Sequence, residues 1–119
     1  MLPSEPLELA YYVSEDGDKP FADWFDALEP VAAGRVTRAL ERMSAGNLSN
    51  AKAIGEGVLE YRIDWGPGYR VYFARDGAVL VVLLIGGTKH RQQRDIAVAK
   101  DFWADYRRRR SEGSRTRRP

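Results

Sequence analysis

Three consecutive segments with the hydrophobic patterns of β-strands constrain the fold of this chain more than any other feature. In residues 58–65 and 69–74, apolar and polar side chains alternate with a period of two, which is typical of strands with two different faces. Residues 78–85 (AVLVVLLI) are apolar throughout, which predicts a central strand covered on both faces. Gly66-Pro67-Gly68 and Asp76-Gly77 are turn sequences between them, so we predict an antiparallel meander.

The residues before the meander predict one strand and two helices. Residues 6–13 (PLELAYYV) are rich in aromatic and aliphatic side chains and predict a short first strand. A helix is expected from Pro20, and a second helix is expected to end at Gly46-Asn47, with Pro30 either interrupting the first or starting the second. The apolar positions at helical spacing are Phe21, Trp24, Phe25, Leu28, Val36, Ala39, Leu40 and Met43. Residues 47–57 are predicted to form a loop.

The residues after the meander predict a final helix and a tail. Gly86-Gly87 is expected to end the last strand, and Thr88 is a candidate N-cap. The helix that follows presents Ile96, Ala99, Trp103 and Tyr106 on one side. The order β-α-α-β-β-β-α predicts an α+β domain, with an antiparallel meander and a helical hairpin, over residues 1–106. Residues 107–119 are rich in arginine and are predicted to form a flexible tail, either a solubilising extension or an anchor for RNA.

Composition limits the kinds of site that this chain can hold. The 119 residues include no cysteine and one histidine. A disulfide framework is therefore excluded, and we expect no metal and no small-molecule cofactor. No run of 18 apolar residues and no signal-peptide pattern occurs, which predicts a cytoplasmic protein without a membrane partner.

Charge is distributed unevenly along the chain. The net charge is +2, from 19 Lys and Arg residues against 17 Asp and Glu residues. Residues 1–29 carry −7, residues 30–105 carry +3 and residues 106–119 carry +6. This asymmetry favours a polyanion as partner, although a solvated arginine-rich tail has the same composition.

Arg62 and Arg70 are predicted to be neighbours on one face of the first hairpin. Apolar residues of the two strands must share the other face, so the numbers of paired residues sum to an even value, either 132 or 134. In both registers Arg62, Arg70 and Tyr72 lie together, although like charges across a ladder cost about 0.2 to 1 kcal/mol. Either Glu60 and Asp64 neutralise the pair, or the face is an anion site.

The start of the last helix is a second place where cations gather. Lys89, His90, Arg91 and Arg94 occupy its first two turns. Cations there oppose the helix dipole by about 0.3 to 1 kcal/mol each, whereas a phosphate would be stabilised. The segment is therefore either a solvated helix start or a second anion site.

The runs YRIDWGPGYRVYF and AVLVVLLIGGTKHRQQRDIAVAKDFWADYR resemble the RelE/ParE superfamily of bacterial toxins, and most closely its HigB-like addiction module killer protein branch. The resemblance implies a RelE-like fold from about Glu8 to Tyr106. It also implies the toxin of a type II toxin–antitoxin module, whose partner is a cognate antitoxin encoded by the adjacent gene. Many RelE- and HigB-like members cut mRNA on the ribosome, whereas ParE-like relatives inhibit DNA gyrase without cutting.

The resemblance places the basic positions of the family on Arg62, Arg70 and Lys89, with Gln93 one turn beyond Lys89. The chain departs from the branch at Thr88, where an acidic residue is usual, and at His90 and Arg91, where small hydroxyl residues are usual. The arginine-rich tail is not a family feature.

These residues predict a metal-independent endoribonuclease that acts by attack of the RNA 2′-OH. The arginines would stabilise the phosphorane, because guanidinium groups stay charged and cannot act as a base. Lys89 is a candidate base if neighbouring cations favour its neutral form, and His90 is either an acid–base group or incidental. The candidate catalytic residues are Arg62, Arg70, Lys89, His90 and Gln93. The candidate RNA-binding residues are Tyr72, Arg91, Arg94, Arg107 and Arg108.

Overall fold

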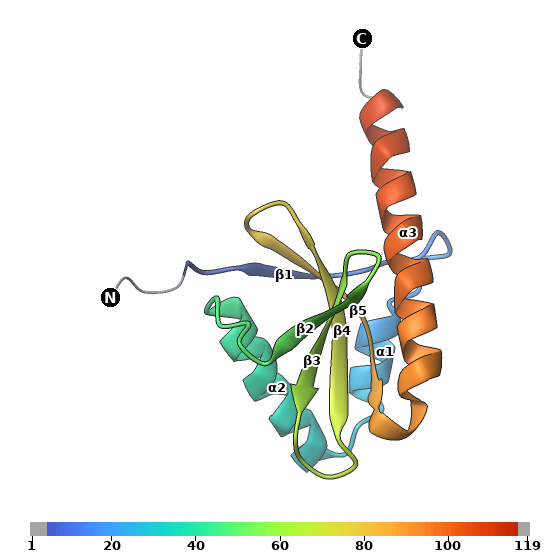
Figure 1. Ribbon diagram of the computed structural model, residues 1–119. Helices are drawn as coiled ribbons and strands as arrows, with labels where there is room; N and C mark the ends of the chain where they lie inside the picture. Colours follow the sequence, from blue (N-terminus) through green and yellow to red (C-terminus); the bar gives the residue numbers. More distant parts are fainter. Residues whose placement is uncertain (1–4, 117–119) are drawn as a thin grey trace.

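The computed structural model describes residues 5–116, which form an α+β fold with a five-stranded sheet between helices (Figure 1). In chain order the elements are β1 (Glu8–Tyr11), α1 (Pro20–Asp26), α2 (Pro30–Ser44), β2 (Ala51–Gly55), β3 (Val58–Ile63), β4 (Tyr69–Asp76), β5 (Leu80–Thr88), the 3₁₀ turn η1 (Lys89–Arg91) and α3 (Gln92–Thr116). Both Pro20 and Pro30 begin helices, so Pro30 starts α2. None of the helices within the described residues is long and apolar enough to span a membrane.

The sheet contains the predicted antiparallel meander. Its strand order is β1-β5-β4-β3-β2, with β3, β4 and β5 paired antiparallel and β1 parallel to β5. β5 is an interior strand because β1 pairs with its outer edge, while β4 holds the central position in the sheet. The β3–β4 pairs sum to 132, which places Arg62 directly opposite Arg70.

The prediction of a loop over residues 47–57 is wrong, because the structure places β2 at Ala51–Gly55. β2 pairs with β3 and supplies partners for backbone groups that would otherwise face outward. The hairpin closes through Gly55, Glu56 and Gly57, which have φ values of 103°, 55° and 86°. Apart from Ile54, β2 lacks the β-branched and aromatic residues that are typical of strands, so no strand pattern is visible in residues 51–55.

The prediction that Gly86-Gly87 ends the last strand is also wrong, since β5 continues through both glycines to Thr88. A Cβ atom on Gly86 would lie within 3.0 Å of the Trp24 ring, and one on Gly87 would lie within 3.0 Å of the Asp95 carboxylate. The glycines are therefore needed because α1 and α3 approach this strand closely from its two faces.

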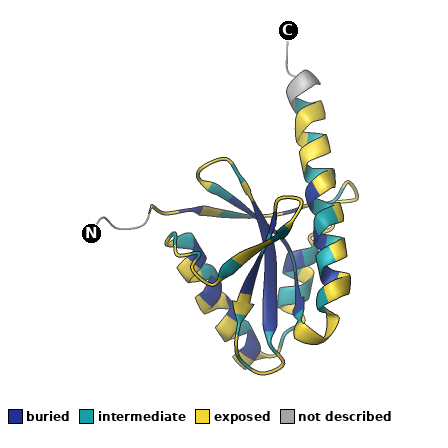
Figure 2. Cartoon of the chain, viewed as in Figure 1, coloured by how far each residue is buried: buried dark blue, intermediate teal, exposed yellow. Residues whose placement is uncertain are grey.

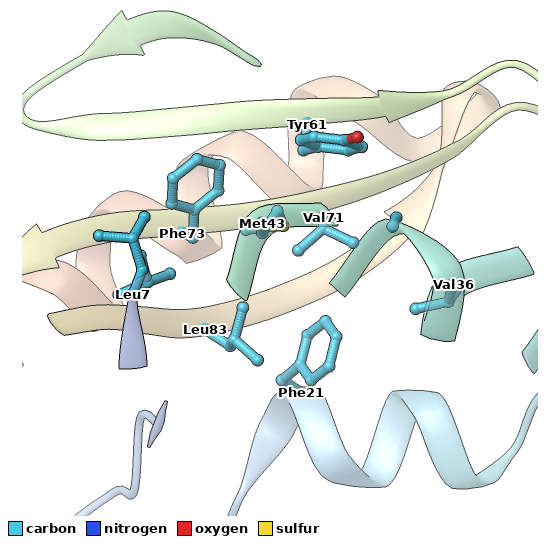
Figure 3. Close-up of a cluster of buried hydrophobic side chains, with 10 residues drawn as sticks. Leu7, Phe21, Val36, Met43, Tyr61, Val71, Phe73 and Leu83 are labelled. Atoms are coloured by element: carbon cyan, nitrogen blue, oxygen red, sulfur yellow. The ribbon is translucent and has the colours of Figure 1, made fainter. Parts of the chain in front are cut away.

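The sheet buries a separate core on each face. Figure 2 shows buried residues along the strands and on the helices beside them. On one face, α1 and α2 cover the sheet, and the residues that meet there include those labelled in Figure 3: Leu7, Phe21, Val36, Met43, Tyr61, Val71, Phe73 and Leu83. On the other face, α3 packs through Ala99 and Trp103 against Val58, Val82 and Leu84. Burial on both faces of β5 agrees with its unbroken apolar sequence.

Residues 107–116 of the predicted flexible tail continue α3 beyond the sheet (Figure 1). Arg108 and Arg109 pair with Asp105 inside the helix, and Arg110 pairs with Asp76. Ion pairs at helical spacing support a segment that composition alone marks as unable to fold. The remainder of the predicted tail, residues 117–119, lies outside the described residues.

Gly86→Ala should reduce the free energy of unfolding by about 1 to 3 kcal/mol, because the added methyl group overpacks against Trp24. Gly34→Ala is the matched control, since this α2 glycine has open space around it. Replacing a helical glycine by alanine should stabilise by about 0.5 to 1 kcal/mol. Urea denaturation measures both. Equal stability of Gly86→Ala and the unmodified protein would contradict the close packing.

Candidate functional site

A buried carboxylate, Glu60, organises the face of the β3–β4 hairpin that α3 covers. The Glu60 side chain is 0% exposed. Its Oε1 accepts a hydrogen bond from Arg62 Nε at 3.1 Å, and its Oε2 accepts one from Tyr72 Oη at 3.1 Å and one from Gln92 Nε2 at 2.8 Å. Arg70 Nε lies 3.9 Å from Oε2. One carboxylate thus contacts both arginines and joins β3, β4 and α3.

These contacts keep Glu60 ionised. Burial alone would raise the pKa of its carboxyl group, but hydrogen bonds from Gln92, Arg62 and Tyr72, together with the charge of Arg70, lower the pKa below its ordinary value of 4.5. The two arginines that face each other across the ladder are therefore neutralised in part by Glu60, as one of the two sequence interpretations expected. Asp64, the other acid in that interpretation, makes no ion pair among the described residues.

Gly68 connects this network to Lys89. Its carbonyl oxygen accepts hydrogen bonds from Arg70 Nη1 at 3.2 Å and from the Lys89 backbone N–H at 2.8 Å. A Cβ atom on Gly68 would lie 3.4 Å from Arg70 Nη1 and 3.4 Å from Lys89 Cβ. The turn between β3 and β4 thus sets Arg70 beside the start of η1. Arg62 and Arg70 therefore lie together, and the backbone of Lys89 lies next to them through Gly68.

The three cations differ in accessibility. The Arg62 side chain is 42% exposed and Lys89 is exposed, whereas Arg70 is only 5% exposed. Arg70 Nε has no hydrogen-bond partner although it is buried. Arg62 and Lys89 can therefore contact a ligand directly, while Arg70 contributes mainly its charge from behind them.

Asp95 is a second buried carboxylate on this face. It is 6% exposed, and its Oδ2 has no hydrogen-bond partner. Burial raises the pKa of Asp95, against the opposing effects of Arg91 and Arg94. The carboxylate lies over Gly87, which pairs with Arg70 in the sheet. Burial therefore leaves the pKa of Asp95 raised, because its Oδ2 receives no hydrogen bond, whereas the donors around Glu60 lower the pKa of that carboxyl group.

The start of the last helix differs from its prediction. Thr88 precedes η1 but makes no side-chain capping hydrogen bond, and the first turn is 3₁₀ rather than α-helical. Gln92, which was not predicted, reaches Glu60, whereas the predicted Gln93 is exposed. The signal was present, since Gln92 lies four residues before Ile96 and so extends the apolar stripe of α3 toward its start.

The remaining candidates fall into three groups. His90, Arg91 and Arg94 are exposed and line a shallow depression formed by residues 89–94. Tyr72, predicted to bind RNA, is fully buried beneath Glu60, so it cannot contact RNA in this structure.

Arg107 and Arg108 do not belong to this site. They follow Gln92 by 15 and 16 residues along α3, which separates them by roughly 22 to 24 Å at the rise of an α-helix. Arg107 lies over the Trp103 ring, and Arg108 pairs with Asp105, Glu112 and Glu15. These two predicted RNA-binding residues therefore make structural contacts at the far end of the helix.

The arrangement is suited to binding an anion and stabilising negative charge. Arg62 and Lys89 offer accessible donors, Arg70 adds a buried charge, and Glu60 holds the guanidinium groups in place. Because it is fully buried, Glu60 positions the arginines and does not itself reach a ligand. Within residues 5–116, no group of three or more histidine or carboxylate side chains is placed to hold a metal ion.

Comparison with known proteins gives two matches. The model of a family described as "Phage derived protein Gp49-like (DUF891)" matches residues 23–102, which include every residue around Glu60. A protein of Haemophilus influenzae, described as an uncharacterized protein, is 40% identical over 81 residues, which cover 67% of this chain and 82% of the relative. The C-terminal part of α3, from Trp103, lies outside the family match.

Glu60→Gln should lower the free energy of unfolding by roughly 1 to 3 kcal/mol at neutral pH, because two arginines lose the charge that compensates them. The folded-state pKa of Glu60 is depressed, so its stabilising contribution is present above pH 4.5 and is lost as pH falls through the folded value. The stability difference between the two proteins should therefore shrink below pH 4.5. Asp95, whose pKa is raised, contributes equally to the pH dependence of both proteins, so its contribution cancels in the stability difference.

Urea denaturation at a series of pH values measures this difference. Glu41→Gln is the control, because Glu41 is exposed on α2, and it should change stability by less than about 0.5 kcal/mol at each pH. A stability difference for Glu60→Gln that stays constant down to pH 3 would show that Glu60 is not held ionised by its partners.

Proposed function

Because the chain belongs to the Gp49-like (DUF891) family of phage-derived proteins, a toxin-like family related to RelE and HigB, we propose that it is the toxin of a type II toxin–antitoxin module. The proposed activity is metal-independent cleavage of mRNA on the ribosome, which stops translation. A cognate antitoxin from the adjacent gene is the proposed neutralising partner. The observation that supports the proposal is that Arg62 and Arg70 both contact Glu60, while the backbone of Lys89 and the side chain of Arg70 both donate to Gly68.

The fold is consistent with this proposal. An antiparallel meander, two consecutive helices on one face and a C-terminal helix on the other agree with the RelE-like fold that the sequence resemblance implies. The cations predicted from that resemblance are the ones that the β3–β4 register and the Gly68 turn bring together. Fold and site therefore support the same class of protein from separate observations.

In the proposed reaction, the 2′-oxygen of RNA loses its proton to a base and attacks the adjacent phosphorus. The P–O5′ bond then breaks, an acid protonates the departing 5′-oxygen, and a 2′,3′-cyclic phosphate remains. Arg62 and Lys89 would bind the phosphate oxygens, and the charge of Arg70 would stabilise the phosphorane from beneath. His90 and Lys89 are the exposed groups able to exchange the two protons.

Lys89→Ala should remove growth inhibition on induction and reduce mRNA cleavage by at least about 100-fold, because it deletes an accessible cation of the site. Stability should change by less than about 0.5 kcal/mol since Lys89 is exposed. Lys89 serves this test better than Arg70, whose removal would disturb a buried network. Lys19→Ala, an exposed lysine before α1, is the charge-matched control and should stay toxic.

Two assays separate cleavage from gyrase inhibition. Translating ribosomes incubated with the protein should yield cut mRNA, and a DNA supercoiling assay should show no effect. Inhibited supercoiling with intact mRNA would instead identify a ParE-like gyrase inhibitor and overturn the proposed reaction. Full toxicity of Lys89→Ala would argue against this site.

The antitoxin is tested separately. Co-expression with the adjacent gene should restore growth and yield a stable complex on affinity purification, because an antitoxin must hold its toxin in an inactive state. Continued toxicity with only free protein recovered would count against the proposed module while leaving the cleavage assay to stand on its own.

A further inference from the structure

α2 carries a row of arginines that neither the resemblance nor the site at Glu60 includes. Arg35, Arg38 and Arg42 recur at i, i+3 and i+7 and therefore share one face of the helix. All three are exposed, and none makes an ion pair within the described residues. Like charges three and four residues apart disfavour a helix, and of the three arginines only Arg42, in the last turn, is favoured by the helix dipole. Fold stability therefore does not explain the row as a whole.

The arginines of α3 provide a contrast in the same molecule. Arg108 pairs with Asp105, Glu112 and Glu15. Arg109 pairs with Asp105, and Arg110 pairs with Asp76. Their charge is used within the fold. The arginines of α2, by contrast, make no ion pair within the described residues, so their charge stays available to a partner.

These arginines border a cavity of about 200 Å³ beside β3. The cavity is also lined by Arg62 and Trp65, with Asp64 as its one carboxylate. The guanidinium carbon of Arg35 lies 5.1 Å from the centroid of the Trp65 ring, so this side chain is held in place before a ligand arrives. Four arginines against one aspartate make the cavity strongly cationic.

We propose that this α2–β3 groove binds the phosphodiester backbone of single-stranded RNA. Arg35 to Arg42 spans seven residues, or about 10 Å along the helix, so the row presents several cations in line to the phosphates of one strand. Arg62 lines the groove and also donates to Glu60, so the groove and the candidate site share this residue although α2 and α3 cover opposite faces of the sheet. The choice of RNA rests on the proposed function.

An acidic protein segment fits the observations less well. Protein partners are usually anchored by apolar or aromatic side chains in desolvated pockets. Here Trp65 is covered by Arg35 and stacks with Tyr69, and Tyr61 is buried. A linear row of cations with little free apolar surface matches a regularly charged backbone better.

The test measures binding of the full-length protein to a 2′-O-methyl oligouridine over a range of salt concentrations. This RNA lacks the attacking hydroxyl, so binding is measured whether or not the protein cleaves. The triple variant Arg35→Gln, Arg38→Gln, Arg42→Gln should bind at least about tenfold more weakly at low salt, and the slope of log K against log salt should flatten by about 2. The single variant Arg38→Gln should flatten the same slope by about 0.7. This variant provides the test if the triple variant is unstable.

The matched control removes three charges from α3 through Arg108→Gln, Arg109→Gln and Arg110→Gln. Because these arginines are ion-paired, this variant should lose stability but keep the salt slope. An unchanged slope in the α2 variants, an equal change in both triple variants, or no RNA binding at all would overturn the proposal. Binding to polyglutamate, a model of an acidic protein segment, is measured in parallel. If the α2 triple variant binds RNA normally but no longer binds polyglutamate, the proposal is also overturned, and the occupant is an acidic protein. If the α2 variants flatten the salt slope as expected but the unmodified protein does not cleave mRNA, the result counts against the proposed function and not against the groove.

Discussion

The structure of the candidate site depends on burying one carboxylate beneath two arginines. A buried ionised group is stable only when charges and hydrogen bonds compensate its lost hydration. Glu60 receives that compensation from β3, β4 and α3 together. In return it permits Arg62 and Arg70 to face each other across a ladder, where like charges would otherwise repel. The contacts that stabilise Glu60 are thus the ones that set the geometry of the cations.

The fold could be predicted where one pattern had a single structural meaning. The alternating strands, the apolar β5 and the helix that begins at Pro20 agree with the observed elements, whereas Pro30 had two interpretations until the structure placed it at the start of α2. The failures occurred where tertiary packing decides local structure. β2 forms because β3 needs a partner, and β5 passes through Gly86-Gly87 because Trp24 and Asp95 occupy the space on either side. Neither requirement is visible in the segment that it shapes.

The site could be predicted only in part, for a related reason. The period of a strand places Arg62 beside Arg70 without any knowledge of the rest of the fold. How deeply each residue is buried could not be predicted in this way, because alternation does not reveal that Arg70 is buried and that Tyr72 is buried completely. The choice between neighbouring glutamines also required the helix phase. Gln92 rather than Gln93 continues the apolar stripe of α3 and so reaches Glu60.

Net charge is a poor guide to what this protein can bind, because the same residue type serves opposite purposes in it. Residues 1–29 are strongly acidic, yet within the described part of this segment only Glu15 forms an ion pair, and it does so with Arg108. The acidic residues therefore do not neutralise the arginines of α2, which lie on a different element. A charge is available to a polyanion when it is both exposed and unpaired. By that criterion Arg108, Arg109 and Arg110 contribute little. Among the described residues, the exposed and unpaired cations include Arg35, Arg38 and Arg42 of α2 and Lys89, Arg91 and Arg94 at the start of the last helix.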